Sequence, residues 1–166
     1  MDERDIAHLR RCLELARAAR DGGNEPFGSL LVDGEGAVVA ERMNTVGDGD
    51  VTGHPELALA AWASAHLTAD ERAAATLYTS CESCAMCAAG QYWAGVGRLV
   101  FALSGEELGA IVPADGPRVL RLSSRDVFAH GNASVQVDGP CWELTEEALG
   151  VFDGLWSGFA GSGTGY

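Results

Sequence analysis

The chain has 166 residues, of which 47% are hydrophobic, and it carries 24 acidic against 11 basic side chains, for a formal net charge of -13. This length and composition predict one globular domain over residues 1–166. Lys and Arg supply most non-specific affinity for nucleic acids, and this acidic sequence contains no lysine. DNA and RNA polymers are therefore not expected as substrates.

The chain begins with a charged segment, and no apolar run approaches the roughly 18 residues of a membrane span. Three of the five cysteines lie between Cys81 and Cys87, a spacing more typical of metal ligands than of a disulfide framework. We expect Cys12 and Cys141 to pack as small hydrophobic side chains. These features predict a cytoplasmic protein with no membrane association.

In chain order, the first part of the sequence predicts a helix, a β-hairpin and a second helix. Apolar residues at helical spacing indicate the helices, and short apolar runs around a Gly/Asp turn indicate the hairpin. The expected elements are a helix over 5–20, strands over 27–32 and 37–43, and a helix over 55–66. Pro55 suits the first position of its helix, where the backbone N–H would lack a partner.

The second part predicts further strands alternating with helices, which is typical of an α/β fold with a central sheet. The expected elements are a strand over 76–79, a helix over 84–94, a strand over 98–103, a strand or loop over 121–128, a short strand over 135–137 and a terminal helix over 145–156. Residues 157–166 are rich in glycine and predict a flexible tail unless a partner orders it.

Two short motifs carry the chemistry of this chain, His54-Pro55-Glu56 and Cys84-Ala85-Met86-Cys87. One imidazole and two thiolates are ligands that Zn²⁺ prefers, and three protein ligands leave its fourth position open for water. Glu56 lies close enough in sequence to move protons without binding the metal. His-x-Glu followed by Cys-x-x-Cys is the signature of zinc deaminases. We therefore predict a catalytic zinc held by His54, Cys84 and Cys87, with Glu56 as general acid and base.

Other interpretations of the same residues remain open at this point. A histidine at a helix start often binds nothing, and Cys-x-x-Cys alone is also a redox motif. Cys81 could join the three ligands in a closed structural zinc site, and three crowded cysteines also occur in iron–sulfur proteins. Glu56 favours the catalytic interpretation, because a structural site has no use for it.

The sequence from about residue 24 to residue 103 resembles the cytidine-deaminase-like superfamily of zinc deaminases, and within it the bacterial guanine and nucleobase deaminases. The segments that carry the resemblance are Asn24–Gly28, Glu41–Asn44, Tyr78–Cys87 and Tyr92–Ala94. The resemblance implies a three-layer α/β/α fold with a central mixed β-sheet. It also implies that Cys84 and Cys87 are the ligands while Cys81 is not, and that Asn44 faces the substrate.

The chain departs from the family pattern in two places beside the motifs. Pro55 stands where the family usually has alanine, which removes a backbone N–H near the substrate pocket, and Ser83 stands where it usually has proline. The acidic loop of guanine deaminases has no match after Leu103. Its candidates by region are Glu106, Glu107 and Asp115, which could equally be ordinary solvated carboxylates.

These observations predict hydrolytic deamination of a free nucleobase or related aminoheterocycle, with release of ammonia and a guanine-like purine favoured. Asn44 would bind an edge of the base, and Phe27 and Trp93 would flank its ring. By resemblance we expect a homodimer in which Trp156, Phe159 and Tyr166 close the pocket. The alternatives are a cytosine-type or triazine-type ring, a nucleoside, a tRNA adenosine, and a zinc-stabilised binding domain without catalysis.

Overall fold

The computed structural model describes residues 1–156, and its centre is one mixed β-sheet. The strands are β1 (Gly28–Val32), β2 (Val38–Met43), β3 (Thr76–Cys81), β4 (Arg98–Leu103) and β5 (Gln136–Asp138). Their order across the sheet is β2-β1-β3-β4-β5. β1 pairs antiparallel with β2 and β3, whereas β3, β4 and β5 run parallel to one another. The central mixed sheet expected from the resemblance is confirmed.

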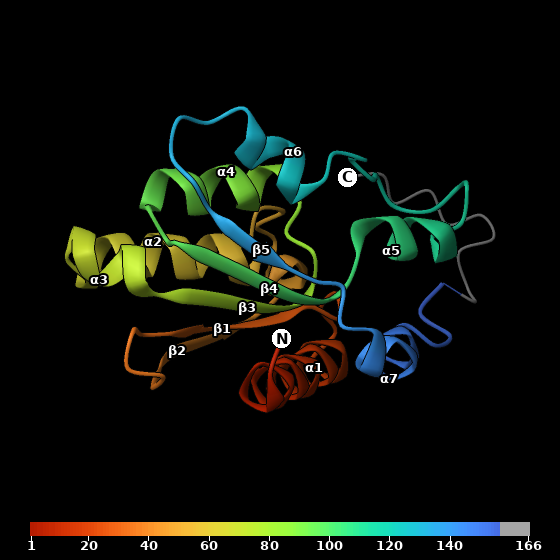
Figure 1. Cartoon of the computed structure of the whole chain (residues 1–166). Helices are drawn as coiled ribbons and strands as arrows, with labels where there is room; N and C mark the ends of the chain where they lie inside the picture. Colours follow the sequence, from red (N-terminus) through yellow and green to blue (C-terminus); the bar gives the residue numbers. More distant parts are fainter. Residues whose placement is uncertain (157–166) are drawn as a thin grey trace.

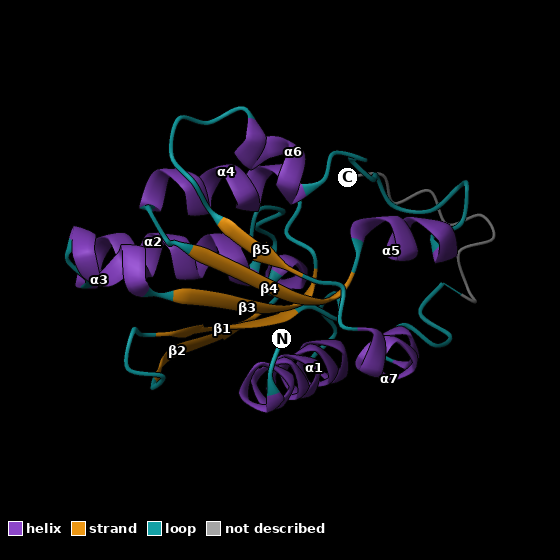
Figure 2. Cartoon of the chain, in the orientation of Figure 1, coloured by secondary structure: helices purple, strands orange, loops and turns teal. Residues whose placement is uncertain are grey.

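Helices cover both faces of the sheet, so the described chain has three layers (Figures 1 and 2). The helices are α1 (Glu3–Asp21), α2 (Pro55–His66), α3 (Ala69–Ala74), α4 (Ala85–Ala94), α5 (Gly105–Ile111), α6 (Ser124–Ala129) and α7 (Thr145–Gly150). α1 and α7 lie on one face, and α2, α3, α4 and α6 lie on the other. The expected α/β/α architecture is therefore confirmed.

Two hydrophobic cores lie on the two faces of the sheet, and β1 contributes to both. Leu30 and Val32 pack with α1, while Leu31 packs with α2 and α4. This alternation follows from the two-residue period of a strand. Every residue of β1 is buried, whereas the edge strand β2 is partly exposed. Cys12 and Cys141 lie in the α1 core, as expected for small hydrophobic side chains.

Three short helices escaped the sequence-based prediction, although each begins with a recognisable N-cap. In each, a hydroxyl accepts a hydrogen bond from the backbone N–H three residues later. The caps are Thr68 for α3, Ser104 for α5 and Ser123 for α6. The expectation of a strand or loop over residues 121–128 is wrong in its second half, because Ser123 and Asp126 start α6 there.

The C-terminal helix is shorter than expected. α7 spans Thr145–Gly150, and turns continue from there to Trp156. Glycine lowers helix propensity, and Gly150 and Gly154 both fall within the predicted helix of residues 145–156. The tail predicted over residues 157–166, with Phe159 and Tyr166, lies outside the described residues.

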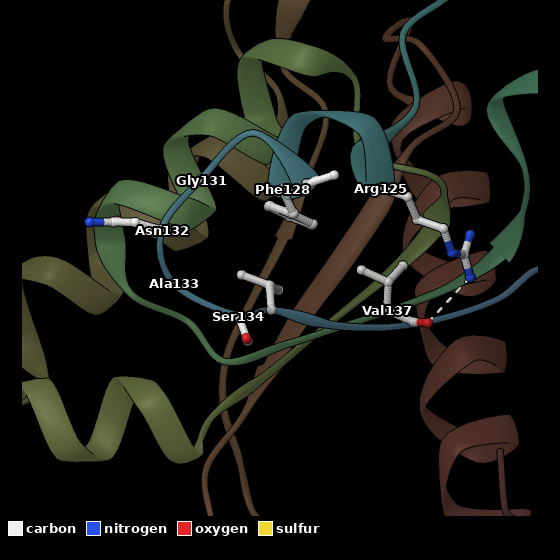
Figure 3. A pocket seen from close by; sticks show the side chains of 9 residues that line it. Arg125, Phe128, Gly131, Asn132, Ala133, Ser134 and Val137 are labelled. Atoms are coloured by element: carbon white, nitrogen blue, oxygen red, sulfur yellow. Dashed lines mark hydrogen bonds between the residues drawn. The ribbon is translucent and has the colours of Figure 1, made fainter.

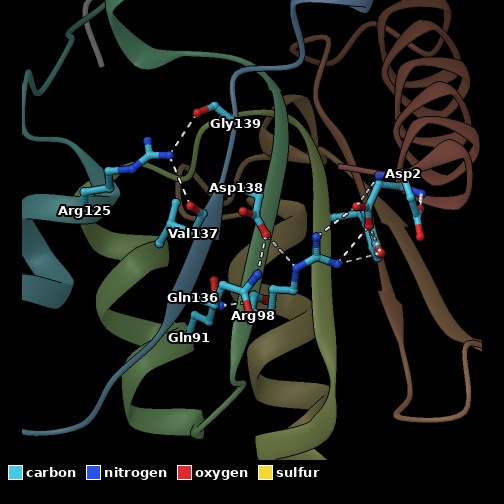
Figure 4. A network of polar contacts seen from close by, with 10 residues as sticks. Asp2, Gln91, Arg98, Arg125, Gln136, Val137, Asp138 and Gly139 are labelled. Atoms are coloured by element: carbon cyan, nitrogen blue, oxygen red, sulfur yellow. Dashed lines mark hydrogen bonds and ion pairs between the residues drawn. The ribbon is translucent and has the colours of Figure 1, made fainter.

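Arg98 at the start of β4 ties three elements together (Figure 4). Its Nη1 and Nη2 atoms donate to the Asp5 carboxylate of α1 at 2.8 and 2.9 Å, and Nε donates to Asp138 of β5 at 2.8 Å. Tyr78 of β3 donates its hydroxyl to Asp5 at 2.6 Å. Burial alone would raise the pKa of Asp5, but hydrogen bonds from Arg98, Tyr78 and the Asp2 backbone N–H lower it to about 2.

We expect Asp5→Asn to lower the free energy of unfolding at neutral pH. We also expect this free energy to fall less in the variant than in wild type as the pH is lowered. The Asp5 pKa falls from an ordinary 3.8 to about 2, so its stabilisation is complete above pH 4 and lost as the pH falls towards 2. The shift corresponds to roughly 2–3 kcal/mol. Urea unfolding measured between pH 7 and pH 2 checks this, with exposed Glu3→Gln on the same helix as control. Equal acid dependence in wild type and Asp5→Asn would contradict it.

Candidate metal centre and catalytic cavity

Two helix N-termini meet beyond the carboxyl ends of the parallel strands and bring the two motifs together. His54 is the N-cap residue of α2, and Pro55 occupies its first turn as expected. Cys84 is the N-cap residue of α4, and Cys87 lies in the first turn of the same helix. α2 and α4 pack against each other on one face of the sheet. This packing places the histidine beside the cysteines although about thirty residues separate them.

His54, Cys84 and Cys87 have the geometry of a three-ligand zinc site. The two sulfurs lie 3.6 Å apart, and His54 Nδ1 lies 3.8 Å from Cys84 Sγ and 3.5 Å from Cys87 Sγ. Tetrahedral Zn²⁺ with ordinary bond lengths requires about 3.8 Å between two sulfurs and about 3.6 Å between sulfur and nitrogen. The three donor atoms therefore fit zinc, with His54 Nδ1 as the ligand nitrogen.

The surroundings of Cys84 favour the thiolate that a metal requires. Hydrogen bonds from Cys87 and His54 outweigh the effect of burial and lower the pKa of Cys84 to about 4. The position at a helix N-terminus acts in the same direction, because the helix dipole stabilises a negative charge.

Cys81 does not belong to this cluster. Among the described residues, the group able to hold a metal consists of His54, Cys84 and Cys87. Cys81 ends β3, is 2% exposed, and packs in the core on the α1 face of the sheet. Burial raises the pKa of its thiol, which keeps it neutral. This placement argues against the closed site with three cysteines and leaves the fourth zinc position free of protein ligands.

Glu56 lies next to the metal ligands, and a hydrogen bond from strand β3 holds its carboxylate. It is 4% exposed, and its Oε1 atom accepts a hydrogen bond from Thr79 Oγ1 at 2.7 Å. Thr79 in turn accepts one from Ser29 Oγ at 2.9 Å. Burial raises the pKa of Glu56, and its charge acts on His54 and Cys84. A buried carboxylate with a raised pKa, beside a metal site, suits proton transfer near neutral pH.

Sequence reasoning missed the residues that support this site. Thr79 and Ser29 lie on adjacent strands and have no motif that marks them. Glu82 joins the two helices that shape the cavity, because its carboxylate accepts hydrogen bonds from Gly105 N at the start of α5 and from Ser124 N and Oγ in α6. The one signal in the sequence was the position of Glu82 directly after β3.

A cavity of about 1140 Å³ opens in front of His54 and Cys84. Its walls come from the segment before β1, the start of α4, the helix α5 with the segment after it, and the turns after α7. Phe27 lines it and contacts Phe152 at 5.6 Å between ring centres, and Phe152 stacks on Trp156 at 5.8 Å. Phe27 and Trp156 therefore both lie at the cavity.

The other two predicted substrate contacts, Asn44 and Trp93, do not line the cavity. Asn44 is fully buried, and its Oδ1 atom accepts a hydrogen bond from Val46 N at 3.0 Å. Its Nδ2 atom has no hydrogen-bond partner in the described part of the chain. Trp93 on α4 is 84% exposed and is not among the residues that line the cavity of its own chain. A contact of Trp93 with substrate would therefore require another subunit.

A second pocket, of about 520 Å³, lies on the far side of α6 and is separate from the metal ligands. Figure 3 shows Arg125 and Phe128 of α6 beside the segment that leads from Gly131 to Val137. Arg125 donates to the Val137 and Gly139 carbonyls, so it is committed to holding this segment. No metal-ligating cluster accompanies this pocket in residues 1–156.

An α/β/α fold with one histidine, two cysteines and a buried glutamate at the starts of two helices defines a zinc-dependent deaminase. The sequence comparison agrees, because residues 2–103 match the cytidine and deoxycytidylate deaminase zinc-binding region. The chain belongs to this family.

Known proteins of the family resemble this chain to different extents. The probable cytosine deaminase of Schizosaccharomyces pombe is 36% identical over 159 residues, which cover 95% of this chain and 96% of that protein. The guanine deaminase of Bacillus subtilis is 39% identical over 88 residues, which cover 52% and 56%. A solved guanine deaminase from Nitrosomonas europaea superposes with a TM-score of 0.66 at 26% identity, covering 87% of this chain and 80% of that one.

Proposed function

We propose that the protein hydrolyses the exocyclic amine of a free nucleobase or similar small aminoheterocycle, releasing ammonia and leaving a carbonyl group. The observation that carries this proposal is the placement of Glu56, buried beside three zinc ligands and held by Thr79. A purely structural zinc site would have no use for a carboxylate in this position. The cavity in front of His54 and Cys84 provides room for the substrate ring.

Each group of the site has a role in this reaction. Zinc, when bound with an open fourth position, lowers the pKa of water to about 7 and polarises the reacting group. Glu56 takes one proton from the attacking water and gives it to the ring nitrogen as the C–O bond forms. It then moves the proton of the new hydroxyl group to the amine, so that the C–N bond breaks, ammonia leaves and the carbonyl forms. Thr79 fixes the Glu56 carboxylate for both transfers through its hydrogen bond to Oε1. Phe27 offers a flat apolar surface to the ring. Asn44 Nδ2 is the proposed donor for an edge of the base, because it has no partner among the described residues, although Asn44 is fully buried and does not line the cavity.

We place a cytosine-type ring first among the substrates and a guanine-like purine second. The similarity to the probable cytosine deaminase extends over 95% of this chain, so it includes most of the residues after Leu103 that line the cavity. The similarity to the guanine deaminase of Bacillus subtilis covers about half of the chain. The purine favoured from sequence retains the support of the solved guanine deaminase.

An ammonia-release assay tests the proposed function directly. The panel holds cytosine, isocytosine, adenine, guanine, aminotriazines, the corresponding nucleosides, and RNA and single-stranded DNA oligomers. We expect turnover of at least one free base, less of the nucleosides, and none of the oligomers, since the protein has a net charge of -13. Turnover of an oligomer without turnover of any free base would overturn the proposal.

We also propose a cytoplasmic homodimer. The five cysteines are free, which suits a reducing compartment. Within the described residues, no helix is both long and apolar enough to cross a membrane. Exposed Trp93 and Met86 lie on α4 and provide apolar surface for a second copy.

We expect light scattering at micromolar concentration to give at least twice the 17.3 kDa mass of one chain. Trp93→Glu should shift the mass towards that of one chain, because it places a charge on the apolar surface of α4. Trp142→Glu is the matched control, because Trp142 is also exposed but lies outside α4. A wild-type mass near 17.3 kDa would defeat the dimer.

A further inference from the structure

Five carboxylates line the catalytic cavity, and Glu25 differs from the others in its surroundings. The other four are Glu82, Glu106, Glu107 and Asp126. Three of these accept hydrogen bonds at helix starts, and Glu106 is exposed. Glu25 is half-buried, and its side chain accepts no hydrogen bond from the described residues. It is thus a sheltered carboxylate that no structural role accounts for.

The backbone around Glu25 is held in place. Asn24 N donates to the Ala19 carbonyl at 2.9 Å, and Asn24 Oδ1 accepts from Gly47 N at 2.7 Å. Phe27 N donates to the carbonyl of Glu25 at 2.8 Å. The carboxylate is therefore carried on a fixed segment between α1 and β1, which is the condition for a preorganised binding group.

Glu25 also shares a cavity with the reacting centre. It lines this cavity together with His54 and Cys84. A second polar atom without a partner belongs to the same cavity, because Ser83 lines it and Ser83 Oγ is buried with no partner among the described residues. Sheltered polar groups without partners are costly unless a ligand or water satisfies them.

We propose that Glu25 is a specificity-determining residue that accepts a hydrogen bond from a substrate N–H other than the leaving amine, and so selects free bases over N-substituted ones. This inference rests on the proposed function of the same cavity. An ionised carboxylate only accepts hydrogen bonds, so it requires a donor on the ring. A free base has a ring N–H at the atom that carries the sugar in a nucleoside. Substitution at that nitrogen removes the donor and leaves the Glu25 charge unpaired.

Matched pairs of bases test this inference: cytosine with 1-methylcytosine, and guanine with 9-methylguanine. We expect Glu25→Ala to lower kcat/KM for the better unmethylated base by about tenfold or more, the effect of losing a hydrogen bond to a charged group. The methylated partner should change little, so the ratio between the two falls. Glu25→Gln retains a carbonyl acceptor and should recover part of the ratio. Glu35→Ala, which removes an exposed carboxylate from the β1–β2 turn, is the charge control.

Binding measured without turnover provides a second readout. Calorimetry in a Glu56→Gln background should show the same tenfold loss of affinity for the unmethylated base when Glu25 is replaced by alanine. Equal effects of Glu25→Ala on both members of a pair, or none on either, would overturn the inference while leaving the deaminase function intact. A wild-type protein that turns over no base would instead overturn the proposed function.

Discussion

Glu56→Gln should reduce kcat by at least about a hundredfold while zinc content, fold and substrate binding persist. Glu56 is buried and is not a metal ligand, since His54, Cys84 and Cys87 make up the set of protein ligands. General acid–base catalysis contributes about 10²–10⁴ in rate, and Glu56 handles two proton transfers in the proposed reaction. The loss corresponds to roughly 3–6 kcal/mol of activation free energy. A glutamine in its place still accepts the Thr79 hydrogen bond, but its amide cannot take up and release a proton.

Steady-state kinetics, elemental analysis and circular dichroism on the purified variant check this expectation. The loss should appear in kcat rather than KM, because the interaction is used in proton transfer and not in ground-state binding. Glu3→Gln, at an exposed position in α1, is the matched control and should behave as wild type. Wild-type turnover by Glu56→Gln with its zinc in place would contradict the mechanism and support a zinc-stabilised binding domain.

The elements that position the site are those that the sequence predicts well. Regular apolar spacing marks α1, and Pro55 marks the start of α2. The strands β1, β3 and β4 are short apolar runs between polar segments, which is the pattern of strands covered on both faces. The ligand motifs sit at the starts of α2 and α4, so the local geometry within each motif follows from its position at a helix start.

The cavity walls could not be predicted in the same way. α5 and α6 have seven and six residues, too few for a helical period to show, and tertiary contacts with Glu82 hold their first residues. Thr79 became part of the site because β1, β3 and α2 pack together, and such contacts between distant segments leave no local pattern. The exposed position of Trp93 likewise depends on how α4 packs.

Substituting single cysteines should separate the metal ligands from their neighbour. We expect Cys84→Ser to lose the zinc that wild type binds at about one ion per chain, because a serine hydroxyl is a poor ligand at neutral pH. Replacing a residue that only hydrogen-bonds to a metal ligand already costs about 10–100-fold in metal affinity. Loss of the ligand itself should therefore cost more. Activity should disappear with the metal. Thermal stability should fall as well, because zinc binding contributes to the stability of the folded state.

Cys81→Ser is the informative comparison, because Cys81 lies three residues from Cys84 but packs in the core on the other face of the sheet. We expect this variant to keep about one zinc ion per chain. Its stability should fall modestly, because a hydroxyl replaces a buried thiol in an apolar core. Elemental analysis and thermal unfolding, each with and without a chelator, give both quantities. Loss of zinc from Cys81→Ser with a normal circular dichroism spectrum would mean that Cys81 is a fourth ligand, and the site would then have no open position for water.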